Sequence, residues 1–292
     1  MVKHNDDLVW ERDGASWPLS QHSRFVESEG LRWHVQIIDS PGAADASPET
    51  LALIHGTGST THSWAAVAPL LANTHRVVMM DLPGHGFTAP LSAHAISLPG
   101  YARRVATLLR DLDLAPTAVV GHSAGAAIAV RMALDGVMPA SARRIIGLNA
   151  ALLPFPGPAA TLFPFLARLL FTNALVPRLF ARRGQDREAV ARLLASTGST
   201  LDDDAIARYA RLFRSPVHVK ATLDMMAYWD LAGLARAMPR LACPLLLAAG
   251  GLDQTVSPER AYEAAKLTPQ AHVELVPKLG HLMQEEDPQQ LA

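Results

Sequence analysis

Gly121-His122-Ser123-Ala124-Gly125 lies between a short apolar run, residues 118–120, and a stretch of small residues from 126 to 134. A Gly-x-Ser-x-Gly pentapeptide between a strand and a helix predicts a nucleophile elbow, a sharp turn that exposes a serine hydroxyl. The glycines are needed because the turn strains the serine backbone and brings neighbouring chain too close for side chains. We therefore expect Ser123 to project alone at the edge of a sheet, as a nucleophile.

The same short pattern also occurs by chance in an ordinary strand, turn and helix, so the candidate nucleophile needs partners. A serine hydroxyl attacks only when a base takes its proton, and a carboxylate must fix the tautomer of that base. In folds with this elbow the order along the chain is serine, acid, histidine. The histidines that follow Ser123 are His218, His272 and His281.

The predicted base is His281. His218 falls in a helical pattern and His272 at the start of a strand, where side chains are committed to packing or to solvent. His281 instead follows the apolar strand 273–276 through a loop that ends in Gly280. Loops after strand ends are where catalytic residues gather.

The predicted acid is Asp253. It leaves the carboxyl end of Pro244–Ala249, a continuous apolar run typical of a parallel strand buried on both faces. A rival position for the acid follows the strand 144–148, but it carries Asn149 followed by alanines. This residue choice favours Asp253.

Two backbone N–H groups must stabilise the oxyanion, one of them from the residue after the nucleophile. That residue is Ala124. The second predicted donor is Thr57, because His55-Gly56-Thr57-Gly58 follows the strand 51–54 and its glycines let the backbone approach a substrate oxygen. Gly84-His85-Gly86 is also glycine-rich, but we interpret it as a structural turn because the chemistry already has its base.

Composition agrees with one enzyme domain. The chain has 292 residues and is 49% hydrophobic, enough for a large core carrying an inserted cap. A net charge of -1 and the lack of a Lys/Arg-rich run argue against nucleic acid as a partner. The lone Cys243 cannot form an internal disulfide, and the twelve histidines lack metal-binding spacing, so we expect neither a metal nor a cofactor.

The beginning of the chain is polar and acidic, without the apolar region of a secretory signal, which predicts a cytoplasmic protein. The sequence also has no run of about 18 uninterrupted apolar residues, which argues against a transmembrane helix.

The fold class predicted from the pattern is α/β, with a mostly parallel central sheet flanked by helices and a helical cap inserted after the sixth strand. Segments 24–27 and 31–38 predict an antiparallel hairpin at the sheet's edge. The expected division is a core from 1 to 150, a cap from 151 to 235, and the rest of the core from 236 to 292. The other predicted strands lie near Leu51, Val77, Ala118, Ile145, Leu245 and Val273.

The cap begins with an apolar stretch, Leu162 to Phe180, flanked by Arg168, Arg178, Arg182 and Arg183. Such a stripe is usual for a helix packed on the core. An alternative is a lid that receives a large apolar substrate or rests on a membrane surface, with arginines facing anionic groups. The residues expected to line the substrate site are His122, Phe155, Phe163 and Trp229.

Motifs beyond the catalytic ones run nearly from end to end of the chain. They include Gly30–Gln36 and Thr61–Trp64 near its start, and Leu148–Phe155, Leu212–Pro216 and Met225–Leu231 in and around the cap. In these motifs the chain resembles the α/β-hydrolases encoded with bacteriochlorophyll-synthesis genes and named magnesium-chelatase accessory proteins, the BchO family. Generic hydrolases do not share them.

This resemblance implies the α/β-hydrolase fold and a role in bacteriochlorophyll synthesis, near magnesium insertion into protoporphyrin, in a phototrophic bacterium. The implied substrate is a tetrapyrrole ester or another lipophilic ester, and the implied partners are magnesium chelatase subunits. The implied location is cytoplasmic, with peripheral contact through the cap at the inner face of the photosynthetic membrane.

The activity favoured is hydrolysis of a carboxylic ester by the triad Ser123, Asp253 and His281. A serine at the elbow speaks against epoxide hydrolases and haloalkane dehalogenases, which resemble this fold but carry a carboxylate there. Carbon-carbon bond hydrolases and cofactor-free haloperoxidases stay open, because the same triad order serves them. A non-catalytic accessory protein that binds a porphyrin or the chelatase is the alternative from another class. The complete triad counts against it, since a strained elbow costs about 1–3 kcal/mol.

Overall fold

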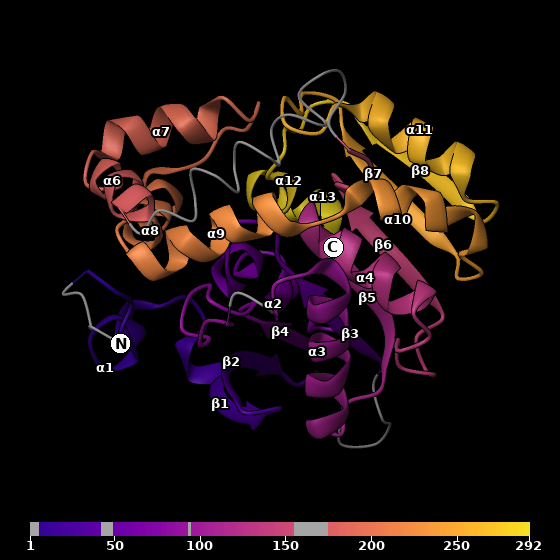
Figure 1. Ribbon diagram of the computed structural model, residues 1–292, viewed down its shortest axis with the longest axis horizontal. Coiled ribbons are helices and arrows are strands. Elements are labelled where there is room, and N and C mark those ends of the chain that lie inside the picture. The colour runs from indigo at the N-terminus through magenta and orange to yellow at the C-terminus, as the bar shows by residue number, and fades with distance from the viewer. Residues whose placement is uncertain (1–5, 42–48, 93–94, 155–174) are drawn as a thin grey trace.

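An eight-stranded sheet forms the centre of the computed structural model, which describes residues 6–41, 49–92, 95–154 and 175–292 (Figure 1). The spatial order of its strands is β1-β2-β4-β3-β5-β6-β7-β8. Their bounds are β1 Ser23–Ser28, β2 Leu31–Ile38, β3 Thr50–Ile54, β4 Arg76–Met80, β5 Pro116–His122, β6 Arg144–Leu148, β7 Leu245–Gly250 and β8 Ala271–Val276. All eight agree with the segments predicted from the sequence.

The sheet is mostly parallel, as predicted. Among the described strands only the pairs β1–β2 and β2–β4 are antiparallel, and β1 is an edge strand, which confirms the expected hairpin. Its turn places Glu29 and Gly30 at φ 48° and 71°, the left-handed region that favours glycine. Because β3 and β5 to β8 run parallel, their carboxyl ends meet at one edge of the sheet.

Alternating side chains of the strands build a hydrophobic core on each face. In β3, Ala52 and Ile54 face one core while Leu51 and Leu53 face the other. The first core is closed by α3 Leu98–Asp111, α4 Ala124–Leu134, α10 Leu231–Ala237 and α11 Pro258–Leu267. The second is closed by η3 Thr61–Trp64, α2 Ala68–Leu71 and α12 Met283–Glu286, with α13 Pro288–Leu291 after it.

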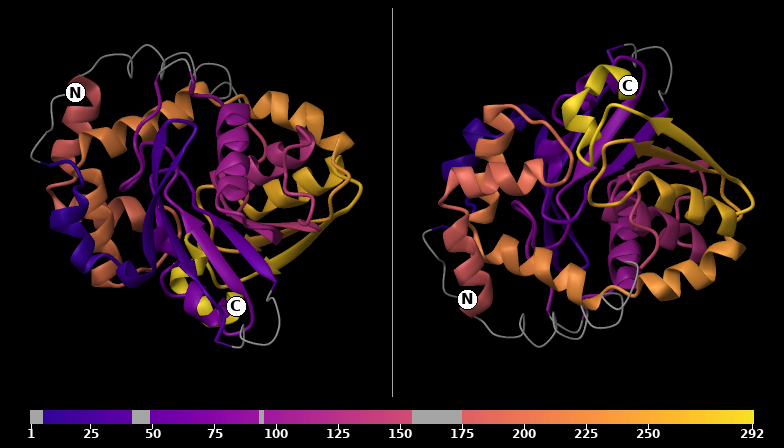
Figure 2. Two further views of the ribbon diagram at one scale, coloured as in Figure 1. Left: turned by 90° about the horizontal axis from the view of Figure 1, so that it is seen from below. Right: turned by 90° about the horizontal axis from the view of Figure 1, so that it is seen from above.

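The cap lies between β6 and β7 and is helical where the structure describes it, as predicted. Figure 1 and Figure 2 show α6 to α8 at the opposite end of the molecule from α11 and β8. Side-chain oxygens of Asp186, Asp202 and Ser215 accept N–H groups of the first turns and so fix where three helices begin. The cap helices are α6 Leu175–Arg183, α7 Arg187–Ala195, α8 Asp203–Phe213 and α9 Pro216–Tyr228, followed by α10.

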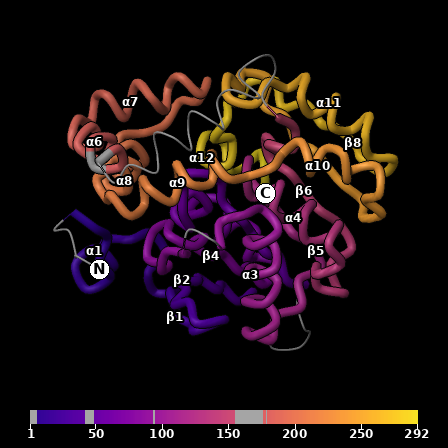
Figure 3. Tube along the Cα trace, viewed as in Figure 1, coloured from indigo at the N-terminus to yellow at the C-terminus, as the bar shows by residue number. Residues whose placement is uncertain are grey.

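The cap also packs on the beginning of the chain. Helix α1, Trp10–Asp13, lies beside α8 (Figure 3), and Arg211 of α8 pairs with the carboxylate of Asp13 at 2.8 Å. A small apolar cluster joins the same parts, with Trp17 against Val190 and Leu194 of α7. Two short 3-10 helices, 14–16 and 20–22, lead from α1 to β1.

The predicted apolar stretch 162–180 lies largely outside the described residues. Of its described part, Leu179 and Phe180 of α6 are 58% and 51% exposed. Within the part of the chain that the structure describes, no helix has the length and apolar character needed to cross a membrane.

Candidate active site

Ser123 stands at the turn from β5 to α4 with φ 50° and ψ -112°, a conformation rarely adopted by residues other than glycine. Its N–H donates to the carbonyl of Leu148 at 2.9 Å. A Cβ atom on Gly125 would lie 2.1 Å from the carbonyl oxygen of Ile54, and one on Gly121 would lie 2.3 Å from the nitrogen of Ala126. The two motif glycines are therefore required by close backbone packing.

His281 and Asp253 form a buried pair. Nδ1 of His281 lies 2.8 Å from Oδ2 of Asp253, and a carboxylate only accepts, so Nδ1 carries the proton. The other oxygen of Asp253 accepts the backbone N–H groups of Thr255 and Val256 at 2.7 and 2.8 Å. These bonds fix the carboxylate and leave Nε2 of His281 as an acceptor.

The loop of His281 lies against the nucleophile elbow. Nε2 of His122, the residue before Ser123, lies 2.8 Å from the carbonyl oxygen of His281. The rings of His122 and His281 are 4.8 Å apart between centroids. The structure therefore brings Ser123, His281 and Asp253, which are far apart in sequence, to one edge of the sheet.

The loop His55–Gly58 also reaches the elbow. A Cβ atom on Gly56 would lie 2.7 Å from Nδ1 of His122 and 3.1 Å from Cβ of Ser123, so glycine is what lets this loop approach the nucleophile. The ring of His55 holds it, because Nδ1 donates to the carbonyl of Gly56 and Nε2 accepts the N–H of Leu82, both at 2.8 Å. Burial lowers the pKa of His55 to about 4, which keeps the ring neutral.

The cap touches the same loop through His218. Nε2 of His218, in α9, donates to the carbonyl of Gly58 at 3.0 Å, and its Nδ1 accepts the N–H of Gly86 at 3.2 Å. Burial lowers the pKa of this histidine to about 4. The helical position predicted for His218 is confirmed. Its contact with Gly58, 160 residues away, has no signal in the sequence.

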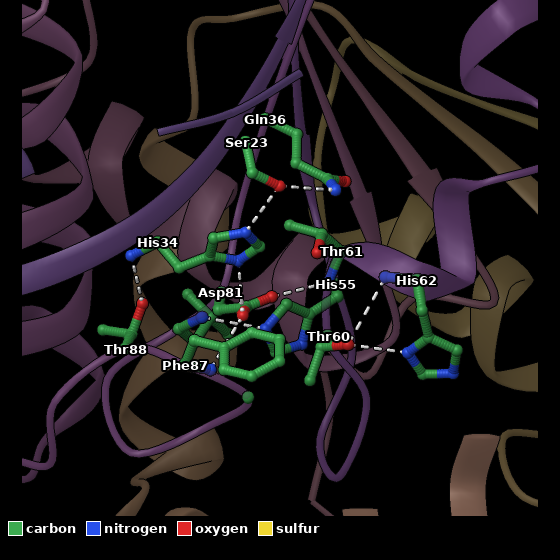
Figure 4. Close-up of polar contacts among 12 residues, drawn as sticks. Ser23, His34, Gln36, His55, Thr60, Thr61, His62, Asp81, Phe87 and Thr88 are labelled. Carbon is green, nitrogen blue, oxygen red and sulfur yellow. Dashed lines mark hydrogen bonds and ion pairs between the residues drawn. The ribbon is translucent and has the colours of Figure 1, made fainter. Parts of the chain in front are cut away.

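Near His55 lies a second chain of a serine, a histidine and an aspartate (Figure 4). His34 contacts the hydroxyl of Ser23 at 3.0 Å and the carboxylate of Asp81 at 2.8 Å. Asp81 also accepts the N–H groups of Thr61 and Phe87, at 2.8 and 3.0 Å. These bonds anchor the turns that flank the loop His55–Gly58. Gly86 belongs to one of these turns, in keeping with the structural role predicted for Gly84–Gly86.

A cavity of about 160 Å³ lies between segments that bond to Ser123 and to Asp253, although none of the three candidate triad residues lines it. One wall is residues 150–154, where the N–H of Ala151 donates to the carbonyl of Ser123 at 3.1 Å. The other is residues 254–257, which hold Asp253, and Leu231 and Arg260 complete the lining. The first wall is apolar, whereas Gln254, Thr255, Ser257 and Arg260 add polar groups on the second.

The residues predicted to line the substrate site lie in different surroundings. His122 is buried and bonded to the loop of His281. Trp229, the residue after α9, packs against Tyr101 at 5.4 Å between ring centroids and is not among the residues that line the cavity. Phe155 and Phe163 lie outside the described residues. Asn149, considered from sequence only as a rival acid position, bonds to Gly250, Gly280 and His281.

The comparisons with known proteins agree with this geometry. A family model described as "alpha/beta hydrolase fold" matches residues 49–288. The chain belongs to the α/β-hydrolase family. It is 37% identical to the magnesium-chelatase 30 kDa subunit of Rhodobacter capsulatus over 271 residues, which cover 93% of this chain and 92% of that protein. The predicted resemblance to BchO-type hydrolases is thereby confirmed.

Solved structures share the fold of this α/β-hydrolase. An esterase from Exiguobacterium antarcticum superposes with a TM-score of 0.73 at 15% identity, covering 91% of this chain and 95% of its own. A deformylase from Pseudomonas putida S16 has a TM-score of 0.68 at 21% identity, covering 92% and 98%. These two hydrolases differ in activity, so the fold alone does not specify the reaction.

Proposed function

We propose that this α/β-hydrolase is a serine ester hydrolase whose triad is Ser123, His281 and Asp253. The observation that carries the proposal is the buried His281–Asp253 hydrogen bond of 2.8 Å, on a loop bonded to the residue that precedes a strained serine. An oriented histidine beside an elbow serine is the arrangement that activates a hydroxyl at neutral pH.

In the proposed mechanism, Nε2 of His281 takes the proton of Ser123 as the hydroxyl oxygen attacks an ester carbonyl. The N–H groups of Thr57 and Ala124 hold the oxyanion, and the Asp253 carboxylate stabilises the imidazolium. His281 then gives the proton to the leaving alcohol. Water, deprotonated in turn by His281, hydrolyses the acyl-enzyme and releases the acid.

The proposed substrate is a lipophilic ester, with a tetrapyrrole ester as the specific candidate. The apolar wall of the cavity, residues 150–154, supports the first part, because it follows β6 and bonds to the elbow. The name of the Rhodobacter capsulatus relative, a magnesium-chelatase subunit, supports chelatase subunits as partners. The tetrapyrrole ester and the role in bacteriochlorophyll synthesis are proposed from the resemblance to the BchO family. Competition by magnesium-protoporphyrin monomethyl ester against labelling of Ser123 tests the candidate directly, and the absence of protection contradicts it.

We also propose a cytoplasmic location with peripheral membrane contact through α6. Leu179 and Phe180 are exposed beside the exposed Arg182 and Arg183, which supports binding at an anionic lipid surface. The protein is expected to co-sediment with anionic liposomes and not with neutral ones. A variant carrying Leu179→Ser and Phe180→Ser should lose this binding, and failure of the unaltered protein to co-sediment contradicts the contact.

Reaction with a fluorophosphonate, followed by intact-mass spectrometry, tests the hydrolase activity. We expect one covalent adduct, absent in Ser123→Ala, because only an activated hydroxyl attacks phosphorus at a useful rate. Ser23→Ala is the matched control, since Ser23 also contacts a histidine paired with an aspartate. It should keep the adduct.

The competing function is a non-catalytic accessory protein, which the name of the relative favours. That function predicts no adduct on the folded protein under conditions that label a known serine hydrolase. An adduct that survives Ser123→Ala and disappears in Ser23→Ala would show that Ser23 is the reactive serine and would contradict the proposed triad.

A further inference from the structure

We propose that Asn149 and His122 are positioning residues that fix the loop of His281 relative to Ser123. The proposal rests on the hydrolase mechanism above and adds two residues to it. Neither is required to touch the substrate or the reacting atoms.

The main-chain carbonyl of His281 accepts two side-chain hydrogen bonds. Nδ2 of Asn149 lies 2.9 Å from this oxygen and Nε2 of His122 lies 2.8 Å from it. Because a carbonyl oxygen only accepts, His122 carries its proton on Nε2. Burial, reinforced by the nearby His281, lowers the pKa of His122 well below its usual value. The ring of His122 therefore holds the loop without adding a charge beside the catalytic imidazole.

Asn149 uses the rest of its amide to tie the loop of the acid to the loop of the base. Its second Nδ2 proton is donated to the carbonyl of Gly280 at 2.8 Å. Its Oδ1 accepts the N–H of Gly250, the last residue of β7, at 2.7 Å. Three residues after Gly250 the chain reaches Asp253, so one buried side chain bonds to both loops that carry the His281–Asp253 pair.

Asn149 is connected to the nucleophile through the main chain. The preceding residue, Leu148, accepts the N–H of Ser123 at 2.9 Å. Asn149 itself adopts φ 46° at the end of β6, a region that asparagine tolerates better than most side chains. This position therefore requires a left-handed backbone conformation together with two hydrogen-bond donors and one acceptor on the side chain. Asparagine meets all three demands, whereas ionised aspartate lacks the donors and alanine lacks every polar group.

Loss of the Asn149 hydrogen bonds should displace the imidazole of His281 and leave the substrate pocket intact. A misplacement of about 1 Å costs about 100-fold in rate when the reacting atoms must be aligned. We therefore expect Asn149→Ala to lower kcat for a p-nitrophenyl ester by about 10- to 100-fold, with little change in KM. The rate of fluorophosphonate labelling should fall by a similar factor.

The pH profile separates positioning from folding. In Asn149→Asp the ionised carboxylate faces two carbonyl oxygens and cannot donate, but its protonated form donates once. The ratio of Asn149→Asp to Asn149→Ala activity should therefore rise as the pH falls, because the ratio cancels every effect of pH that the two variants share. A purely structural role would reduce the fraction of protein that labels at the end point, and leave the rate per labelled serine unchanged.

Asn73→Asp is the matched control, because Asn73 is exposed and remote from the triad, and it should behave as the unaltered protein. His122→Phe keeps a ring but removes one of the two hydrogen bonds to the carbonyl of His281, so it should show a smaller loss of kcat. This variant provides the test if the Asn149 variants do not fold. The positioning role is contradicted if the rate per labelled serine is unchanged in Asn149→Ala, or in His122→Phe where only that variant folds. Such a result does not contradict the proposed hydrolase activity. No labelling of the unaltered protein overturns the hydrolase itself.

Discussion

Ser123 holds a backbone conformation that costs about 1–3 kcal/mol for a residue with a side chain. Main-chain bonds offset that cost, because its N–H donates to Leu148 while its carbonyl accepts the N–H groups of Ala126 and Ala151. The elbow is thus held from α4 and from the end of β6 at once. Because the backbone of Ser123 is held in this way, the turn cannot relax to an ordinary one. The hydroxyl therefore keeps the fixed position that alignment with His281 requires.

Asp253→Asn should abolish most activity without unfolding the protein. The amide oxygen can keep the bonds from Thr255 and Val256, but the amide nitrogen then faces Nδ1 of His281 and forces the proton onto Nε2. That tautomer cannot accept the proton of Ser123, so we expect kcat/KM to fall by about 10,000-fold.

Ester hydrolysis and thermal unfolding of the same Asp253→Asn sample would check this. Asp113→Asn is the control, because Asp113 is exposed and its φ of 53° suits asparagine. A nearly unaltered kcat/KM in Asp253→Asn would show that another carboxylate orients the histidine.

Helix α8 joins the cap to the two segments that flank the site. The hydroxyl of Tyr209 donates to Oε1 of Glu285 at 2.7 Å and lies 3.3 Å from the hydroxyl of Ser59. Ser59 follows the loop His55–Gly58, and Glu285 belongs to α12, just after His281. Burial raises the pKa of Glu285 to about 8, against the opposing effect of the Tyr209 hydroxyl. This contact between cap and core is therefore sensitive to pH.

Glu285→Gln should stabilise the protein at alkaline pH. Between the ordinary value of 4.5 and the folded value of about 8, the folded protein binds this proton more tightly than the unfolded chain does. The contribution of Glu285 to stability is therefore present at low pH and is lost as the pH rises through this range. Glutamine cannot ionise and still accepts from Tyr209, so its melting temperature should exceed that of the unaltered protein by a few degrees at alkaline pH.

Well below pH 4.5 the Glu285→Gln variant and the unaltered protein should melt together, because the carboxyl is then protonated in the folded protein and in the unfolded chain alike. Glu11→Gln, at an exposed position, should follow the unaltered protein throughout. Equal melting temperatures for Glu285→Gln and the unaltered protein at alkaline pH would contradict the raised pKa.

Across the whole molecule, the features that could be predicted from the sequence are those that a local sequence pattern encodes. The run Pro244–Ala249 and the elbow Gly121–Gly125 specify a buried strand and a turn within a few residues, so the sheet and the candidate triad followed from the sequence. The roles of Asn149 and His218 could not follow. Their partners lie up to 132 and 160 residues away, and nothing beside either residue signals them. Contacts of that range depend on how the loops meet at the sheet's edge.

Buried neutral histidines surround that edge on several sides. Burial lowers the pKa of His55 and His218 to about 4 and that of His62 to about 3. Their rings hold main-chain or hydroxyl groups of the loops around Ser123, as His218 holds Gly58. The geometry of the candidate site therefore depends on imidazoles that the fold keeps uncharged.

We expect the whole protein to lose stability steeply between pH 6.5 and about pH 4. In this range the unfolded chain binds protons at these histidines and the folded protein does not, so stability is present at higher pH and falls as the pH falls. One pKa unit corresponds to about 1.4 kcal/mol, so two such residues offset a large part of the roughly 5–15 kcal/mol that stabilises a typical domain. Melting temperatures measured across this range should fall less steeply in His218→Gln, whose amide can still donate to Gly58, than in the unaltered protein. His75→Gln is the control and should match the unaltered protein. If His218→Gln keeps the full slope, the acid sensitivity arises from other groups.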